Sequence, residues 1–153
     1  MNQVAELLPV ANILLDVEAG SKARLFDVVG ALVESSSGLS RSTVVDSLST
    51  REKLGSTGLG QGVAIPHGRI KGLREAQGAF VRLRAPIPFD APDGKPVAQV
   101  FILLVPEQAT ERHLQLLSEL AQMFSEKHFR ERLATASNPT ELRALFDGWA
   151  ASA

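Results

Sequence analysis

Residues 97–105 read VAQVFILLV, an apolar run that only Gln99 interrupts. A strand with one solvent-exposed face alternates apolar and polar side chains, whereas a strand that is covered on both faces needs no such alternation. The run therefore predicts a central β-strand with other elements packed against both of its faces.

Shorter apolar segments on either side of this run predict further strands. They occupy residues 11–17, 63–65 and 79–83. Residues 85–96, APIPFDAPDGKP, have the composition of a turn region. This proline-rich loop is also a candidate edge for contact with a partner, although turn chemistry alone explains its composition.

Helices are predicted where apolar residues recur every three or four positions behind a capping residue. The clearest start is Asn138, which is followed by Pro139 and by Glu141 three residues after the cap. Other helices are predicted over residues 21–38, 40–53 and 129–134, and from residue 110 onward. The helix that is capped near Thr110 is predicted to turn inward the apolar residues Leu114, Leu117, Leu120, Ala121 and Phe124.

These elements together predict the fold class. Helices flank strands at both ends of the chain, so the economical architecture is α/β, a three-layer α/β/α sandwich on a mixed β-sheet. A length of 153 residues is enough for one domain with a substantial core. With no repeat, low-complexity tract or linker in view, we expect a single domain over residues 1–153.

The composition excludes several classes of function. Sixteen basic and seventeen acidic residues give a net charge of −1, so no sequence-wide positive field is available to bind nucleic acid or an anionic membrane. Glu6, Pro9 and Asp16 interrupt the apolar N-terminal residues, which resemble neither a signal peptide nor a membrane span. The chain has no cysteine, which suits a reducing compartment. We therefore expect a cytoplasmic protein.

Residues 55–68, GSTGLGQGVAIPHG, break the periodicity of the chain with five glycines. A glycine-rich segment is often no more than a turn, and the histidine that follows Pro66 no more than a surface residue. The segment lacks the Gly-Lys-Ser/Thr step of a P-loop, the spacing of a dinucleotide-binding loop and the G-x-S-x-G elbow of serine hydrolases. Nucleotide binding and serine hydrolysis are therefore not predicted.

Phosphoryl transfer to the imidazole of His67 fits this segment better. An unperturbed pKa of about 6.5 leaves one ring nitrogen free as a nucleophile at neutral pH. Glycines let backbone N–H groups approach phosphoryl oxygens, and hydroxyl groups add donors. Such transfer depends more on positioning and charge neutralisation than on bond-making side chains. The predicted phosphoryl-binding residues are Ser56, Thr57, Gly58, Gly60, Gly62 and Gly68.

Residues 51–68, REKLGSTGLGQGVAIPHG, resemble the phosphohistidine signature of the mannitol/fructose-type enzyme IIA domains of the bacterial phosphotransferase system. More narrowly, they resemble the nitrogen-regulatory branch of that family. The resemblance covers essentially the whole chain and includes PIPFDAPDGKPV at 86–97, FILLVPEQ at 101–108 and HLQLLSELAQMF at 113–124. It implies an α/β sandwich with a mixed sheet, and a phosphotransferase component with a phosphohistidine intermediate.

The resemblance also implies the roles of individual residues. His67 would accept a phosphoryl group on Nε2 from a small histidine phosphocarrier protein, with no metal and no organic cofactor. A second histidine and an arginine line the site in the family, and His113 and Arg51 match them. His113 would donate a hydrogen bond to the phosphoryl group, and Arg51 would neutralise its charge.

The residues themselves leave alternatives open at these two positions. His113 could simply edge the core of its helix, and Arg51 could serve only the C-terminus of its helix, where a cation contributes about 0.3–1 kcal/mol. A helix N-terminus nevertheless keeps the ring of His113 neutral and attracts anions. His128 is predicted to be a surface residue. The three histidines lack the spacing of a zinc site, so no metal site is predicted.

The resemblance implies two possible functions, and a third reading is a binding module alone. In the first, phosphate on His67 changes which proteins bind, and the protein thereby signals nitrogen, potassium or carbon status. The targets in the family include potassium-uptake components and sensor kinases. In the second, the domain relays phosphate to a sugar-specific IIB component on a separate chain. The chain itself has no cysteine to serve as a IIB phosphoryl carrier, which favours regulation. A binding module without phosphoryl transfer is disfavoured by the intact motif.

Overall fold

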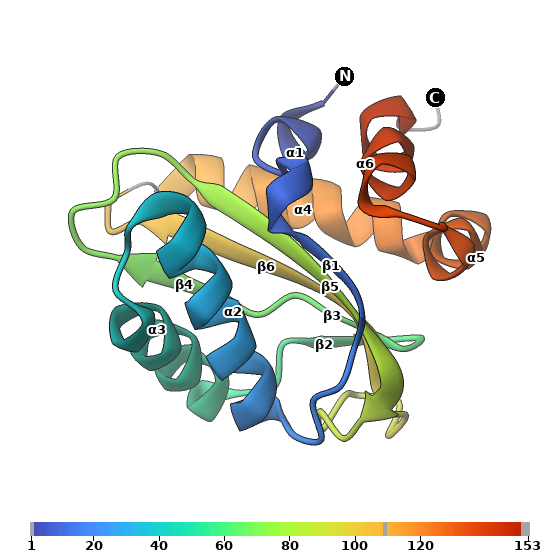
Figure 1. Ribbon diagram of the computed structural model, residues 1–153, viewed down its shortest axis with the longest axis horizontal. Coiled ribbons are helices and arrows are strands. Elements are labelled where there is room, and N and C mark those ends of the chain that lie inside the picture. The colour runs from blue at the N-terminus through green and yellow to red at the C-terminus, as the bar shows by residue number, and fades with distance from the viewer. Residues whose placement is uncertain (1, 109, 151–153) are drawn as a thin grey trace.

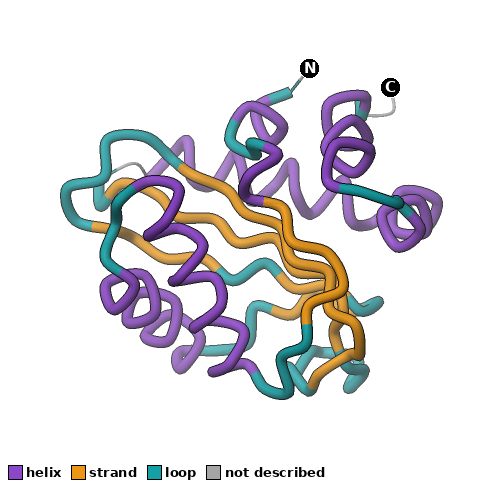
Figure 2. The backbone as a smooth tube through the Cα atoms, viewed as in Figure 1, coloured by secondary structure: helices purple, strands orange, loops and turns teal. Residues whose placement is uncertain are grey.

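The computed structural model describes residues 2–108 and 110–150, and for Thr110 the backbone alone. A mixed sheet of six strands lies between two layers of helices (Figure 1). The helices α2 and α3 cover one face of the sheet, and α1, α4, α5 and α6 cover the other (Figure 2). The predicted α/β class and three-layer α/β/α sandwich are confirmed.

The strands pair in the order β1-β5-β6-β3-β2, and β4 also pairs with β6. β5 is antiparallel to β6 and β2 to β3, whereas β1 is parallel to β5, and β3 and β4 are both parallel to β6. The central strand is thus the run with which the sequence analysis began. Their bounds are β1 Ile13–Val17, β2 Gly58–Gly60, β3 Val63–Ala64, β4 His67–Ile70, β5 Gln77–Ile87 and β6 Val97–Pro106.

Successive side chains of β6 enter opposite halves of the core. Val100, Ile102 and Leu104 pack in the cluster beneath α2 and α3. Phe101, Leu103 and Val105 pack in the cluster beneath the four other helices. Each of the six is at most 1% exposed. Burial on both faces explains why this strand has no polar alternation.

Three helices, α2, α3 and α6, begin directly after the capping residues Ser21, Ser40 and Asn138. The side chain of Ser21 accepts a hydrogen bond from Arg24 N at the start of α2, and that of Asn138 accepts one from Glu141 N at the start of α6. A single turn of 3₁₀ helix covers Val10–Asn12. The helices are α1 Gln3–Glu6, α2 Lys22–Ser37, α3 Arg41–Leu54, α4 Thr110–Ser125, α5 Lys127–Thr135 and α6 Pro139–Gly148.

Strand lengths were partly wrong in the prediction. β5 runs to Ile87 and so includes Pro86, which we had assigned to the proline-rich turn. Its register with β6 shifts between Arg82 and Ile87, and a proline is tolerated where the ladder is irregular. The short elements α1, β2 and β4 were not predicted, because three or four residues carry too little periodicity to detect.

The buried face of α4 also differs from the predicted one. Leu116, Leu120 and Met123 are fully buried, whereas Leu114 is 67% exposed and Ala121 is exposed as well. The helix carries two overlapping apolar stripes, and packing against the sheet selects the one that includes His113. Thr110 is the first residue of the helix rather than its cap, so the cap position falls on residue 109, outside the described residues.

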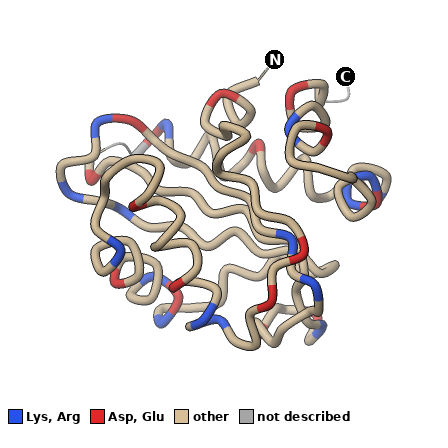
Figure 3. The backbone as a smooth tube through the Cα atoms, in the orientation of Figure 1, with Lys and Arg blue, Asp and Glu red and all other residues tan. Residues whose placement is uncertain are grey.

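Charged side chains of both signs are interspersed along the described chain (Figure 3). Within that part of the chain, no helix is both long enough and apolar enough to cross a bilayer.

Candidate functional site

His67 lies at a break in a strand. Residues 63–64 and 67–70 pair with the same edge of β6, in β3 and β4, and Ile65 and Pro66 separate the two strands. We expected the ring at the end of a strand over 63–65, but His67 instead begins β4. Because the ladder is interrupted, the carbonyl oxygen of Ile65 is available to a side chain.

The imidazole of His67 is half-buried and hydrogen-bonded through both nitrogens. Nδ1 lies 2.9 Å from the carbonyl oxygen of Ile65, and Nε2 lies 3.3 Å from Nε of Arg51. A carbonyl oxygen can only accept a hydrogen bond and a guanidinium N–H can only donate one. The neutral ring therefore carries its proton on Nδ1 and keeps the lone pair on Nε2.

Arg51 is held in the last turn of α3 by a second contact. Its Nη1 donates to the carbonyl oxygen of Gly55, 2.8 Å away, just beyond the end of the helix. This bond leaves Nε directed at Nε2 of His67. Arg51 and His67 were both predicted as site residues, and the fold brings them together.

His113 also lies against His67, from the first turn of α4. The two rings meet edge to face, with centroids 5.3 Å apart and planes at 86°. His113 is 8% exposed, and its Nδ1 is buried with no hydrogen-bond partner among the described residues. A buried polar atom without a partner is costly and calls for an explanation. His113 lies at the edge of the core and also beside His67, and its predicted role at the site stays a prediction.

Both histidines are kept neutral by their surroundings. Burial is the main cause that lowers the pKa of His67 below its usual 6.5, and the charge of Arg51 lowers it further. Burial also lowers the pKa of His113, with His67, Arg69 and Arg51 adding smaller effects. Neutral imidazole at physiological pH is the form that can attack phosphorus at one ring and donate a hydrogen bond from the other.

The two histidines and Arg51 line one hollow of about 540 Å³. Arg69 lines it too, and its Nη1 lies 3.4 Å from the carbonyl oxygen of Glu107. Sequence reasoning missed Arg69, although strand alternation from His67 would have placed it on the same face of β4. The hollow thus combines two guanidinium groups with a nucleophilic nitrogen, a set suited to a phosphate dianion. Its other lining residues are Asp46, Ser47, Thr50, Leu54 and Gly68.

The predicted hydroxyl donors have protein partners instead. The hydroxyl of Ser56 donates to the carbonyl oxygen of Phe89 at 2.6 Å, and that of Thr57 donates to Oε1 of Glu52 at 2.6 Å. Gly58, Gly60 and Gly62 belong to the β2–β3 hairpin and are not among the described residues that line the hollow. The fold therefore brings none of these five to His67, because the loop turns back onto α3 before the strand begins.

Gly68 is the predicted glycine that does line the hollow, and packing explains its small size. A Cβ atom at this position would overlap Oγ of Ser47 and come within 3.2 Å of that residue's backbone carbon. Ser47 in turn donates to the carbonyl oxygen of Arg69 at 2.9 Å. Gly68 thus lets α3 approach β4 and brings Arg51 within reach of His67.

The third histidine and metal binding stand apart from this site. His128 is an exposed residue of α5, as predicted. Across residues 2–108 and 110–150, no group of three or more His, Asp or Glu side chains is placed to hold a metal ion.

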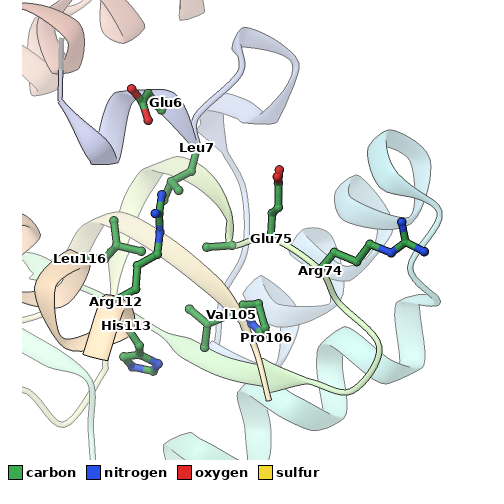
Figure 4. Close-up of a pocket in the computed structure, with 10 residues that line it drawn as sticks. Glu6, Leu7, Arg74, Glu75, Val105, Pro106, Arg112, His113 and Leu116 are labelled. Carbon is green, nitrogen blue, oxygen red and sulfur yellow. The ribbon is translucent and has the colours of Figure 1, made fainter. Parts of the chain in front are cut away.

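A second cavity, of about 390 Å³, lies on the other side of His113 (Figure 4). Leu7, Val105 and Leu116 supply buried apolar walls. Arg112 extends along the opening towards Leu7, whereas Arg74 points away from it. His113 therefore forms a wall between two hollows.

Comparison with known proteins places the chain in a family. The family model for the EIIA 2 component of the phosphoenolpyruvate-dependent sugar phosphotransferase system matches residues 6–148. The nitrogen regulatory protein of Pseudomonas aeruginosa is 42% identical over 137 residues, which cover 89% of each chain. The crystal structure of nitrogen regulatory protein IIA-Ntr from Neisseria meningitidis is 58% identical, with a TM-score of 0.90 over 94% of this chain and 99% of that one.

A more distant structure shows how far the fold extends. The mannitol IIA of Escherichia coli is 22% identical and shares the fold with a TM-score of 0.76, over 90% of this chain and 96% of its own. The match to the family model over nearly the whole chain and the nitrogen regulatory relatives agree with the motif around His67. The chain belongs to the EIIA 2 family of the bacterial phosphotransferase system.

Proposed function

We propose that this protein carries a phosphoryl group on Nε2 of His67 and that the phosphoryl group changes which proteins bind to it. The family is a phosphotransferase component that works through a histidine. The observation that carries the assignment is the state of the ring. Its Nδ1 proton is hydrogen-bonded to the carbonyl oxygen of Ile65, and its Nε2 lone pair faces Arg51 in the hollow.

The transfer step needs no movement of protons. Nε of Arg51 first gives up its hydrogen bond to Nε2 of His67 and turns to the phosphoryl oxygens. The freed Nε2 lone pair attacks phosphorus, the N–P bond of a phosphorylated histidine phosphocarrier breaks, and its electron pair returns to the donor's ring. The Nδ1 proton of His67 stays on the ring throughout, hydrogen-bonded to the carbonyl oxygen of Ile65. The phosphorylated ring therefore becomes cationic. Arg51 and Arg69 offset the charge of the phosphoryl oxygens, and His113 donates a hydrogen bond to one of them.

The regulatory role is favoured over sugar transport by the relatives. The proteins of P. aeruginosa and N. meningitidis that resemble this chain are both named nitrogen regulatory proteins. A phosphoryl group adds close to two negative charges at the hollow, about −1.5 to −2 at neutral pH. A partner whose surface fits the unmodified hollow then loses affinity through repulsion and desolvation.

An exposed apolar residue of the hollow supports its use as a docking surface. Leu54 lines the hollow and is 82% exposed, and Leu114, which follows His113 in the sequence, is 67% exposed. We infer that a histidine phosphocarrier docks here as donor in the cytoplasm. The same face would bind regulatory targets such as potassium-uptake components or sensor kinases.

The acceptor is tested by incubating the purified protein with ³²P-labelled histidine phosphocarrier. We expect acid-labile, base-stable label on the wild type and on His128→Ala, a matched change at an exposed histidine. The label should be absent from His67→Ala. Label that persists in His67→Ala would place the acceptor elsewhere and overturn the assignment.

The switch is tested by capture of partners on immobilised protein. Partners should bind the wild type and should be lost from His67→Asp, which places a permanent negative charge in the hollow. Equal binding to both forms would contradict the switch while leaving the carrier activity in place.

A further inference from the structure

We propose that Glu52 is a positioning residue that fixes both hydrogen bonds of the His67 ring. The inference deepens the proposed function, since it assigns a residue that prepares the acceptor without touching it. Glu52 lies in the last turn of α3, next to Arg51, and is 9% exposed. Sequence patterns gave no reason to single it out.

Both oxygens of the Glu52 carboxylate accept hydrogen bonds from neighbouring donors. Oε2 accepts from Nζ of Lys22 and from the backbone N–H of Thr57, both at 2.9 Å. Oε1 accepts from the hydroxyl of Thr57 at 2.6 Å. A buried carboxylate that ties both donors of one loop residue fixes that residue's backbone.

One branch leads from Thr57 to Nδ1 of His67. The carbonyl oxygen of Thr57 accepts from the backbone N–H of Ile65 at 3.0 Å. The carbonyl oxygen of Ile65 then accepts from Nδ1 of His67 at 2.9 Å. The position of the group that selects the ring tautomer therefore depends on the loop that Glu52 holds.

A second branch leads from the same loop to Nε2. Gly55 lies between Glu52 and Thr57, and its carbonyl oxygen accepts from Nη1 of Arg51 at 2.8 Å. Arg51 then directs Nε at Nε2 of His67. Both nitrogens of the acceptor ring thus trace back to Gly55 and Thr57, which lie three and five positions after Glu52.

A carboxylate serves here better than an amide would. Glutamine would place its NH₂ group either at Oε2, against the ammonium of Lys22 and the backbone N–H of Thr57, or at Oε1, where the Thr57 hydroxyl would have to accept instead of donate. In either orientation the ion pair with Lys22 is lost. Lys22 offsets the burial of the charge, and its Nζ also lies 4.5 Å from the centre of the Phe89 ring.

The test compares Thr57→Val, which removes the hydroxyl at constant shape, with Thr57→Ser, which keeps it. Glu52→Gln is the second probe, and Leu133→Ala, a buried change in α5, controls for lost stability. The tautomer of His67 is read from the ¹⁵N chemical shifts of its ring. Phosphoryl acceptance is measured with phosphoramidate, a small donor that needs no docking surface.

We expect Thr57→Val and Glu52→Gln to populate the Nε2–H tautomer of His67 and to slow acceptance about tenfold or more, as the loss of hydrogen bonds to a charged group implies. Thr57→Ser and Leu133→Ala should keep the Nδ1–H tautomer and the wild-type rate. An unchanged tautomer in both Thr57→Val and Glu52→Gln would overturn the inference. If the wild type accepted no phosphoryl group while the tautomer still followed Thr57, the proposed function would fail and the positioning role would stand.

Discussion

The ring of His113 meets the ring of His67 edge to face, 5.3 Å between centroids, at the point where two hollows approach each other. The contact joins the start of α4 to the start of β4, and both elements adjoin the central strand β6. His113 is buried and kept neutral, with an Nδ1 that has no partner within the described chain. Such a residue stabilises the fold little and is well placed to serve a neighbouring group.

Replacing His113 with alanine tests whether its role is chemical or structural. We expect phosphoryl transfer to slow about 10- to 100-fold, the range for the loss of one hydrogen bond to a charged group. The free energy of unfolding should fall by only about 1 kcal/mol. Transfer kinetics and urea unfolding measure the two effects. Unfolding of most of the protein at neutral pH would instead identify His113 as a core residue.

The lowered pKa values of the two histidines predict a pH dependence. In the folded protein, His67 and His113 resist protonation below pH 6.5, whereas in the unfolded chain they bind protons at their usual pKa. Stability is therefore fully present above pH 6.5 and is lost as the pH falls towards the folded-state pKa values. The double variant His67→Ala/His113→Ala should show a flatter decline in urea titrations between about pH 7 and 5. A decline as steep as that of the wild type would contradict this origin.

Arg51 should be sensitive to shape as well as to charge. Arg51→Lys keeps the positive charge but cannot reach both Gly55 and Nε2 of His67 with one planar group. We expect it to transfer phosphate more slowly than the wild type and faster than Arg51→Gln. NMR titration of His67 gives a second readout, because the loss of charge in Arg51→Gln should raise the pKa of the ring. A rate for Arg51→Lys equal to that of the wild type would show that shape is irrelevant, and equal rates for the two variants would show that the charge alone contributes nothing.

Gly68→Ala should destabilise the protein through the contact between α3 and β4. The added Cβ meets Oγ, Cβ and the carbonyl carbon of Ser47, and overpacking of this kind costs about 1–3 kcal/mol. The double variant Ser47→Gly/Gly68→Ala removes the side chain in question and should recover part of the loss. Urea midpoints measure both. A Gly68→Ala variant as stable as the wild type would show that the helix can move away freely.

The exposed side chains of Leu54 and Leu114 should contribute to the affinity for partners and not to the stability of the fold. Leu54→Ser and Leu114→Ser should weaken binding of the phosphocarrier, since each removes apolar area from the docking surface. Val10→Ser, at a similarly apolar exposed position that precedes the edge strand β1, is the control. Thermal midpoints should be unchanged in all three. Calorimetry that finds equal affinity for wild type and both leucine variants would exclude this surface.

Much of the architecture could be predicted from local patterns. The apolar run at β6 predicted a strand buried on both faces, and Ser21 and Asn138 predicted two helix starts. In the structure both side chains accept the expected capping hydrogen bonds. Element edges were harder to predict. The strand predicted over residues 79–83 extends in the structure to Gln77–Ile87, and the irregular register with β6 accommodates Pro86 within it.

The site was predictable at the level of residues and less so at the level of contacts. His67, Arg51 and His113 do meet, but Ser56 and Thr57 were expected to face phosphate and instead bind Phe89 and Glu52. Residue type shows that a hydroxyl can donate, whereas its acceptor depends on how the loop folds over α3. The position of Arg69 could be predicted from strand alternation with His67. The role of Glu52 depends on tertiary contacts and leaves little trace in the sequence.

The place of His67 within a paired strand has a consequence for timing. The backbone of His67 pairs with β6. A phosphoryl group on this residue is therefore not attached to a loop whose movement could change the structure elsewhere in the molecule. Under the proposed function, donor and target would contact the same small area directly and would compete for it. Loading with phosphate and binding of a target would then be mutually exclusive, and their order would be set by the relative abundance of the two partners.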